Sequence, residues 1–270
     1  MRAYRVAYDG RPFHGFQRQP SVPTVEDALL DALRALDVLD GGVPSGWAAA
    51  GRTDAGVSAI AQTVAFEAPA WLTPRAFDAE LPESVRVWAR ADVPPGFHAT
   101  HDARERSYRY ALYAPDADDD RARAACDALS GTHDFHNLTP DDSGTVRVLS
   151  LSCRRDGPVL VLTARAGGFA RELVRRLVTV VRGVGTGDVD LSAVDRLLGP
   201  DPVDGPEGVA PAPPTPLLLR EVTYDVTFEV DPAAAARARA AFADRRAEHV
   251  ALERTFGAAA DALDGAGPEG

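Results

Sequence analysis

The sequence contains no lysine. All 29 of its fixed cations are arginines, and they stand against 40 aspartate and glutamate residues, so the formal net charge is −11 at pH 7. Carboxylates hold water and cations at a protein surface where salt competes for both, and the weakly hydrated guanidinium group stays useful in planar, bidentate contacts. A GC-rich genome also favours arginine over lysine, but it does not account for the acidic surplus. We therefore interpret the composition as an adaptation to concentrated salt.

Cysteine and long apolar runs are also scarce. Cys126 and Cys153 are the only two cysteines, so neither a disulfide framework nor a four-ligand zinc site is available, and a reducing compartment is expected. No apolar run approaches the 18 residues of a membrane span, and the first ten residues alternate in polarity instead of forming the apolar stretch of a signal peptide. These absences predict a soluble, cytoplasmic protein with no membrane association.

What the chain does have is enough apolar material for about two lobes, since 45% of its 270 residues are hydrophobic. Alternating patterns predict strands over 2–9, 46–50, 60–66, 107–113, 146–154, 159–165 and 217–230, and helical spacing predicts helices over 25–36, 121–129, 171–181 and 233–254. We expect an α/β (α+β) fold with helices flanking a mixed, mainly antiparallel sheet. Its parts would be an N-terminal lobe (1–105), a C-terminal lobe (106–230), and an Ala/Arg-rich helix with a disordered tail (231–270).

The most unusual segment is the loop at residues 51–57, Gly-Arg-Thr-Asp-Ala-Gly-Val, which connects two predicted strands. Loops held by rigid strands often carry functional groups. Asp54 can act there as a nucleophile, a general base or a metal ligand, and Arg52 can pair with it or bind an anion. By spacing alone, the simpler interpretation is a turn in which the Asp54 side chain caps backbone N–H groups.

The same seven residues resemble the catalytic loop of the tRNA pseudouridine synthase A family. Further matching segments occur in the family's order at residues 8–10, 13–19, 24–26, 97–99, 107–110, 134–135, 169, 173–175 and 217–219, so the resemblance covers residues 1 to about 228. It implies the pseudouridine synthase fold in a salt-adapted archaeon. The implied activity is the isomerisation of uridine to pseudouridine in the anticodon stem-loop of tRNA, at tRNA positions 38 to 40, by a homodimer that needs no cofactor and no metal.

The resemblance also implies a role for individual residues. Asp54 is the catalytic carboxylate, and Arg175 is the arginine paired with it. A uridine inside a stem must be flipped out to react, and Arg52 matches the family arginine that braces the gap. Tyr108 matches the tyrosine that lies against the target base, and Leu217 matches an apolar residue on the opposite side of that base.

Two further positions bear on this interpretation. Gln17 lies in the matched segment 13–19 and is expected to contact the substrate. Ser58 stands where the family loop usually has histidine, so the contact made there is expected to differ. Two alternatives remain open: a catalytically inactive relative that binds or folds tRNA, and an unrelated hydrolase that uses Asp54 as its nucleophile or metal ligand.

RNA binding by so acidic a chain requires an uneven charge distribution, because phosphate contacts draw on basic surface. Arginines do gather beside the candidate site segments, at positions 104, 106, 109, 171, 175, 176, 182, 11 and 18, whereas acidic residues gather at 116–120, 141–142 and 188–207. This predicts a basic cleft in an acidic surface. The histidine pairs 98/101 and 133/136 lack thiolates or a carboxylate motif that would complete a metal site, so surface or packing roles are favoured for them.

Overall fold

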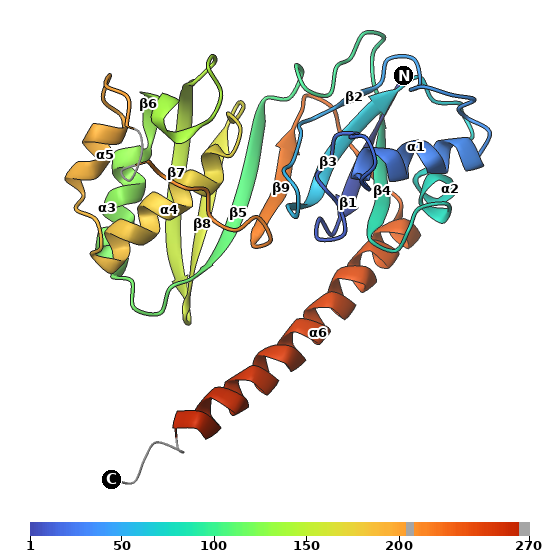
Figure 1. Cartoon of the computed structure of the whole chain (residues 1–270). Coiled ribbons are helices and arrows are strands. Elements are labelled where there is room, and N and C mark those ends of the chain that lie inside the picture. The colour runs from blue at the N-terminus through green and yellow to red at the C-terminus, as the bar shows by residue number, and fades with distance from the viewer. Residues whose placement is uncertain (204–207, 265–270) are drawn as a thin grey trace.

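A computed structural model describes residues 1–203 and 208–264 of the chain (Figure 1). One ten-stranded sheet runs through it in the order β10-β4-β1-β3-β9-β5-β8-β7-β6, with β2 paired to β3. The strands are β1 (Arg2–Tyr8), β2 (Ala48–Ala49), β3 (Ser58–Phe66), β4 (Val85–Asp92), β5 (Glu105–Tyr113), β6 (Gly131–Asp134), β7 (Val146–Asp156), β8 (Val159–Ala166), β9 (Leu217–Thr223) and β10 (Glu229–Val230). Only the β3–β9 pairing is parallel among the described strands, so the expected mixed, mainly antiparallel sheet is confirmed.

Helices cover parts of this sheet (Figure 1). They are α1 (Val25–Ala35), α2 (Pro74–Ala79), α3 (Asp119–Leu129), α4 (Leu173–Thr186), α5 (Ser192–Leu197) and α6 (Pro232–Asp264), with a short 3₁₀ turn at His136–Leu138. The start of α1 shows why the sequence forms a helix there: the Thr24 hydroxyl accepts a hydrogen bond from the Asp27 backbone N–H at 3.2 Å, and carboxylates occupy the first turn. Buried Leu29 and Leu33 then present one apolar face to the core.

The apolar interior consists of two clusters. One contains the aromatic residues Tyr4, Phe66 and Phe77 together with α1, and the other contains α3, α4 and the strands β5, β7 and β8. Strand β9 belongs to both, because Leu217 packs in the second cluster and Leu219 in the first. The lobe bounds at 105 and 230 stay a prediction, since the two clusters share this strand.

One expected element was wrong, and strand β4 was missed. The single strand expected over 217–230 is two short strands, β9 and β10, which pair with different neighbours in the sheet. The chain between them crosses the sheet face, where the Phe228 ring covers the Arg5 guanidinium at 4.0 Å and the Tyr224 hydroxyl donates to the Ala99 carbonyl. Strand β4 was not expected, although buried residues at every second position from Val85 are a strand signal.

Helix α6 is longer than the predicted 233–254 segment. It begins at Pro232, where the Asp231 carboxylate accepts from the backbone N–H groups of Ala233 and Ala234, and it continues through an alanine-rich stretch that nothing interrupts. Its first turns pack on β4 and α2, with Ala234 and Ala238 buried, its middle contacts the body as far as His249, which meets Arg11, and its end projects away from the body (Figure 1). The tail predicted to be disordered lies, from residue 265 on, outside the described residues.

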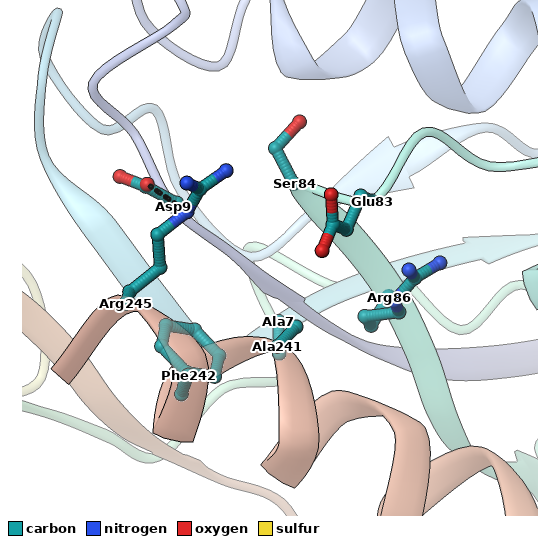
Figure 2. A pocket seen from close by; sticks show the side chains of 8 residues that line it. All are labelled: Ala7, Asp9, Glu83, Ser84, Arg86, Ala241, Phe242 and Arg245. Atoms are coloured by element: carbon teal, nitrogen blue, oxygen red, sulfur yellow. Dashed lines mark ion pairs between the residues drawn. The ribbon is translucent and has the colours of Figure 1, made fainter. Parts of the chain in front are cut away.

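A small cavity marks the seam between α6 and the sheet (Figure 2). Its volume is about 10 Å³, which is no more than a single water molecule requires. Arg245 of α6 crosses this seam to Asp9, with 3.7 Å between Nε and Oδ2. The seam is therefore a packing contact between helix and sheet. Within residues 1–203 and 208–264, no helix is long and apolar enough to cross a membrane.

Candidate active site

A large cleft brings all six of the predicted site residues together. Its volume is about 1410 Å³, which is enough for an extruded nucleotide and part of the strand that carries it. The residues predicted for the site that line the cleft are Gln17, Arg52, Asp54, Tyr108, Arg175 and Leu217. They come from the segment after β1, the loop before β3, β5, α4 and β9, so the topology of the sheet assembles them.

Buried polar groups hold the loop that carries Asp54. The hydroxyls of Thr53 and Tyr8 share a hydrogen bond of 2.8 Å, and the Thr53 carbonyl accepts from the Phe16 backbone N–H at 3.0 Å. The buried Gln62 amide donates to the Gly51 carbonyl at 2.9 Å. Because these partners lie on β1, β3 and the segment after β1, the loop is fixed by several elements. It is more than the self-capped turn that spacing alone suggested.

Asp54 and Arg175 form an ion pair within the cleft. Their Oδ2 and Nη1 atoms are 3.1 Å apart, and the side chains are 30% and 13% exposed, respectively. The Arg175 Nε also donates to the Ala212 carbonyl at 2.6 Å, and Glu172 lies 4.0 Å from the guanidinium. The guanidinium offsets the cost of holding the Asp54 carboxylate in its charged form in a cleft wall that is only partly open to water.

An aromatic and aliphatic surface faces this ion pair. The rings of Tyr108 and Phe169 meet edge to face, with centroids 5.2 Å apart, and Leu217 is 5% exposed at the start of β9. Burial raises the pKa of the Tyr108 hydroxyl to about 12, an effect that the nearby Arg106 opposes and Asp54 reinforces. The phenol is therefore neutral near pH 7 and can donate a hydrogen bond there.

The rim of the cleft holds exposed polar residues. Arg52 and Gln17 are both exposed, and within the described part of the chain no ion pair includes Arg52. Ser58, which replaces the family's usual histidine, accepts a hydrogen bond from the Gly10 backbone N–H at 3.0 Å. The Ser58 hydroxyl therefore holds the chain beside the loop, and Arg52 and Asp54 still line the cleft.

The arginines differ from the expected basic cleft in two respects: most of the nine are paired with carboxylates, and most do not line the cleft. The pairs are Arg11–Asp9, Arg18–Asp27, Arg104–Asp225, Arg171–Asp141 and Arg176–Glu172. Of the nine arginines expected there, Arg106, Arg171 and Arg175 line the cleft and the other six do not. Each of the paired arginines contacts a carboxylate, and a count of charges along the sequence does not reveal the pairing.

Sequence reasoning did not assign several residues of the cleft wall to the site. Arg147 reaches the cleft from β7, and no motif marks it in the sequence. His98 and His101 also line the cleft, where their rings contact each other at a centroid distance of 4.2 Å and a tilt of 36°, and a surface or packing role stays the prediction for them. In the part of the chain that the structure describes, no group of three or more His, Cys, Asp or Glu side chains is arranged to hold a metal ion.

A carboxylate paired with an arginine, beneath an aromatic surface in a cleft of nucleotide size, is suited to an enzyme that acts on a base extruded from RNA. A family model described as tRNA pseudouridine synthase matches residues 125–225. The chain is also 62% identical over 262 residues to tRNA pseudouridine synthase A of Natronomonas pharaonis, a match that covers 96% of this chain and 98% of the relative. The chain therefore belongs to the tRNA pseudouridine synthase A family, whose members isomerise uridine in tRNA.

Other relatives of the same description agree. The protein from Halobacterium salinarum is 61% identical over 260 residues, covering 95% of this chain and 97% of the relative. The protein from Methanosarcina acetivorans is 38% identical over 232 residues, covering 84% of this chain and 86% of the relative. Because the relatives at 61% and 62% identity come from halophilic archaea, the interpretation of the composition as salt adaptation is confirmed.

Proposed function

We propose that this enzyme uses Asp54 as the nucleophile that converts uridine to pseudouridine in the anticodon stem-loop of tRNA. The observation that carries the proposal is the Asp54–Arg175 ion pair, which holds a carboxylate opposite Tyr108 inside the cleft. In this reaction the bond from ribose C1′ to N1 breaks, a bond from C1′ to C5 forms, C5 loses a proton and N1 gains one. An ionised carboxylate can promote the exchange by attack at C1′ or at C6.

The other cleft residues position the base. The Tyr108 ring stacks on the uracil, Leu217 contacts its opposite face, and Gln17 contacts the flanking strand at the rim. Because the pKa of Tyr108 is raised to about 12, the phenol accepts the C5 proton only as its own proton leaves, in the manner of a relay. This chemistry requires no cofactor.

We expect a phenylalanine at position 108 to separate the hydroxyl from the ring. Tyr108→Phe keeps stacking on the base and the edge-to-face contact with Phe169, so tRNA affinity should stay within about threefold of the wild-type value. The rate should fall by roughly 10²-fold if the hydroxyl relays the proton. Single-turnover rates and binding constants, measured with one tRNA transcript, test this. A wild-type rate would remove the hydroxyl from proton transfer and leave the ring in base positioning.

Arg52 is assigned to the flipping step. Its exposed side chain is free to enter the stack that the uridine leaves, and flipping costs a few kcal/mol when the base is paired. Arg52→Ala should therefore lose about 10²-fold in rate on tRNA with a paired target. A transcript in which the target uridine is already unpaired should recover at least part of that loss. An equal loss on both transcripts would instead indicate a direct chemical role for Arg52.

The proposed enzyme is a cytoplasmic homodimer that binds tRNA. One assay separates it from its two alternatives: incubation with an unmodified tRNA transcript and a chelator, followed by chemical labelling of pseudouridine. The proposal expects labelled pseudouridine in the anticodon stem-loop without added metal. An inactive tRNA-binding relative would bind the transcript and leave it unmodified, and a hydrolase would release a product or require a divalent ion.

A further inference from the structure

Arg106 is a buried cation in the wall of the cleft. It lies on β5 two residues before Tyr108, and the residue is 7% exposed. Its guanidinium donates to three carbonyl oxygens: Nε and Nη2 to Ala50 at 3.0 and 2.6 Å, Nη2 to Thr100 at 2.7 Å, and Nη1 to Gly167. In residues 1–203 and 208–264, no ion pair includes Arg106. Carbonyl dipoles alone therefore compensate its charge.

The three carbonyls belong to three separate walls of the cleft. Ala50 directly precedes the loop that carries Asp54. Thr100 belongs to the segment 98–101, and its hydroxyl bonds the Ala49 carbonyl at 2.5 Å. Gly167 begins the segment that leads to Phe169 and then to α4, which carries Arg175. Arg106 is thus a point at which walls that are distant in sequence are joined.

Stability alone does not account for a buried charge of this kind. A buried charge without an opposite charge loses its hydration, and apolar residues of similar volume commonly stabilise a fold at least as well. The planar guanidinium, however, presents several donors in a fixed fork, which fixes the relative positions of the groups that accept from it. A lysine ammonium would keep the charge but concentrate its donors at one point on a flexible stem.

We infer that Arg106 is a positioning residue for the isomerisation, because its guanidinium fork fixes the distance between the Asp54 loop and the Tyr108–Phe169 surface. This inference rests on the proposed function, in which Asp54 attacks a nucleotide held by Tyr108. A displacement of about 1 Å between reacting groups can cost 10²-fold in rate. Although Arg106 lines the cleft, its guanidinium donors are directed at the carbonyls of Ala50, Thr100 and Gly167, so it acts through the walls that it joins and not by binding the RNA backbone.

The first test is Arg106→Lys, assayed beside wild-type protein and Asp54→Asn. We expect kcat to fall by about 10²-fold, whereas the tRNA dissociation constant changes by less than about threefold. Full activity with weakened tRNA binding would overturn the inference and assign Arg106 to phosphate contacts. Wild-type values of both constants would overturn it as well. Absence of pseudouridine in the wild-type reaction would instead reject the proposed function, so the two failures are distinguishable.

Arg155 of β7 provides a matched control. Its guanidinium also bonds two carbonyl oxygens, those of Ala114 and Ala117, and it pairs with Asp119, but it does not line the cleft. Arg155→Lys should lower the melting temperature and leave the kcat of the folded protein unchanged. If Arg155→Lys and Arg106→Lys lower kcat equally at equal loss of stability, Arg106 is merely structural and the inference fails.

Chemical rescue supplies a readout that a structural role would not move. Arg106→Ala leaves a space that matches a guanidinium ion, so ethylguanidinium at non-denaturing concentration should restore at least a tenth of the lost kcat, whereas ethylammonium should not. Equal rescue by both ions would show that charge alone suffices and would overturn the inference. Absence of rescue by either ion would also overturn it. If Arg106→Ala does not fold, Arg106→Gln replaces it: kcat at or above that of Arg106→Lys would then overturn the inference.

Discussion

Replacing Asp54 by asparagine is expected to abolish pseudouridine formation while tRNA binding persists. The amide keeps the shape of the side chain and its place opposite Arg175, but it carries no negative charge with which to attack C1′ or C6. We expect the single-turnover rate to fall by roughly 10⁴-fold or more, a loss typical of removing a group that participates directly in the chemistry. The tRNA dissociation constant should change by less than about threefold.

The measurement is pseudouridine yield over time with enzyme in excess of tRNA. Asp119→Asn is the matched control, because Asp119 also pairs with an arginine, Arg155 at 2.7 Å, but lies outside the cleft lining. That variant should turn over at the wild-type rate. Turnover of Asp54→Asn within tenfold of wild type would remove Asp54 from the role of nucleophile.

The second large effect concerns salt. In dilute buffer, 40 carboxylates against 29 arginines repel one another, and raising the KCl concentration from 0.1 M to 1 M shortens the Debye length from about 10 Å to about 3 Å. Relief of a few kcal/mol of repulsion raises the melting temperature of a chain of this size by about 10 °C. We therefore expect stability to rise over this range, and activity to hold or increase.

The same screening weakens phosphate contacts, which makes the activity part of this prediction the more demanding. Tyr108 stacking and the fit of the cleft to the base are short-range and depend little on salt. Of the predicted arginines that line the cleft, Arg171 and Arg175 pair with carboxylates and Arg106 bonds carbonyl oxygens, so few of their donors remain for phosphate. Thermal melts and turnover across a KCl series test both parts, and greatest stability and activity at low salt would contradict the salt adaptation.

The sequence was most informative where residues act locally. Thr24 marked the start of α1 because an N-terminal cap bonds a backbone group three positions along the chain. Alternation marked the hairpin of β7 and β8 at nearly its observed bounds, since each strand buries one face. The six site residues were predicted through the resemblance, which transfers positions that no local pattern brings together: Arg175 lies 121 positions from its partner Asp54.

What could not be predicted depends on contacts between distant segments. The pattern over 217–230 predicts one strand. It does not show that Phe228 covers Arg5, or that the chain divides there into two strands, the second of which pairs with β4. The charge of an arginine likewise says nothing of its partner. Arg106 was grouped with the arginines of a basic cleft, but its guanidinium bonds three backbone carbonyls, and only the folded chain shows which ones.

The order of strands has a consequence for the synthesis of the chain. Strand β9 lies between β3 and β5 and is, among the described strands, the one that joins them, yet it is made late, with its end about 170 residues after Asp54. At 5–20 residues per second, a ribosome needs roughly 8 to 35 s for that interval. During this time the Asp54 loop already has Tyr8 and Gln62 to hold it, and Tyr108 and Arg175 are made as well, but the strand that pairs with both β3 and β5 is still missing. A chain interrupted before Leu217 therefore contains Asp54, Tyr108 and Arg175 but lacks the strand that joins the two parts of the sheet on which they are held.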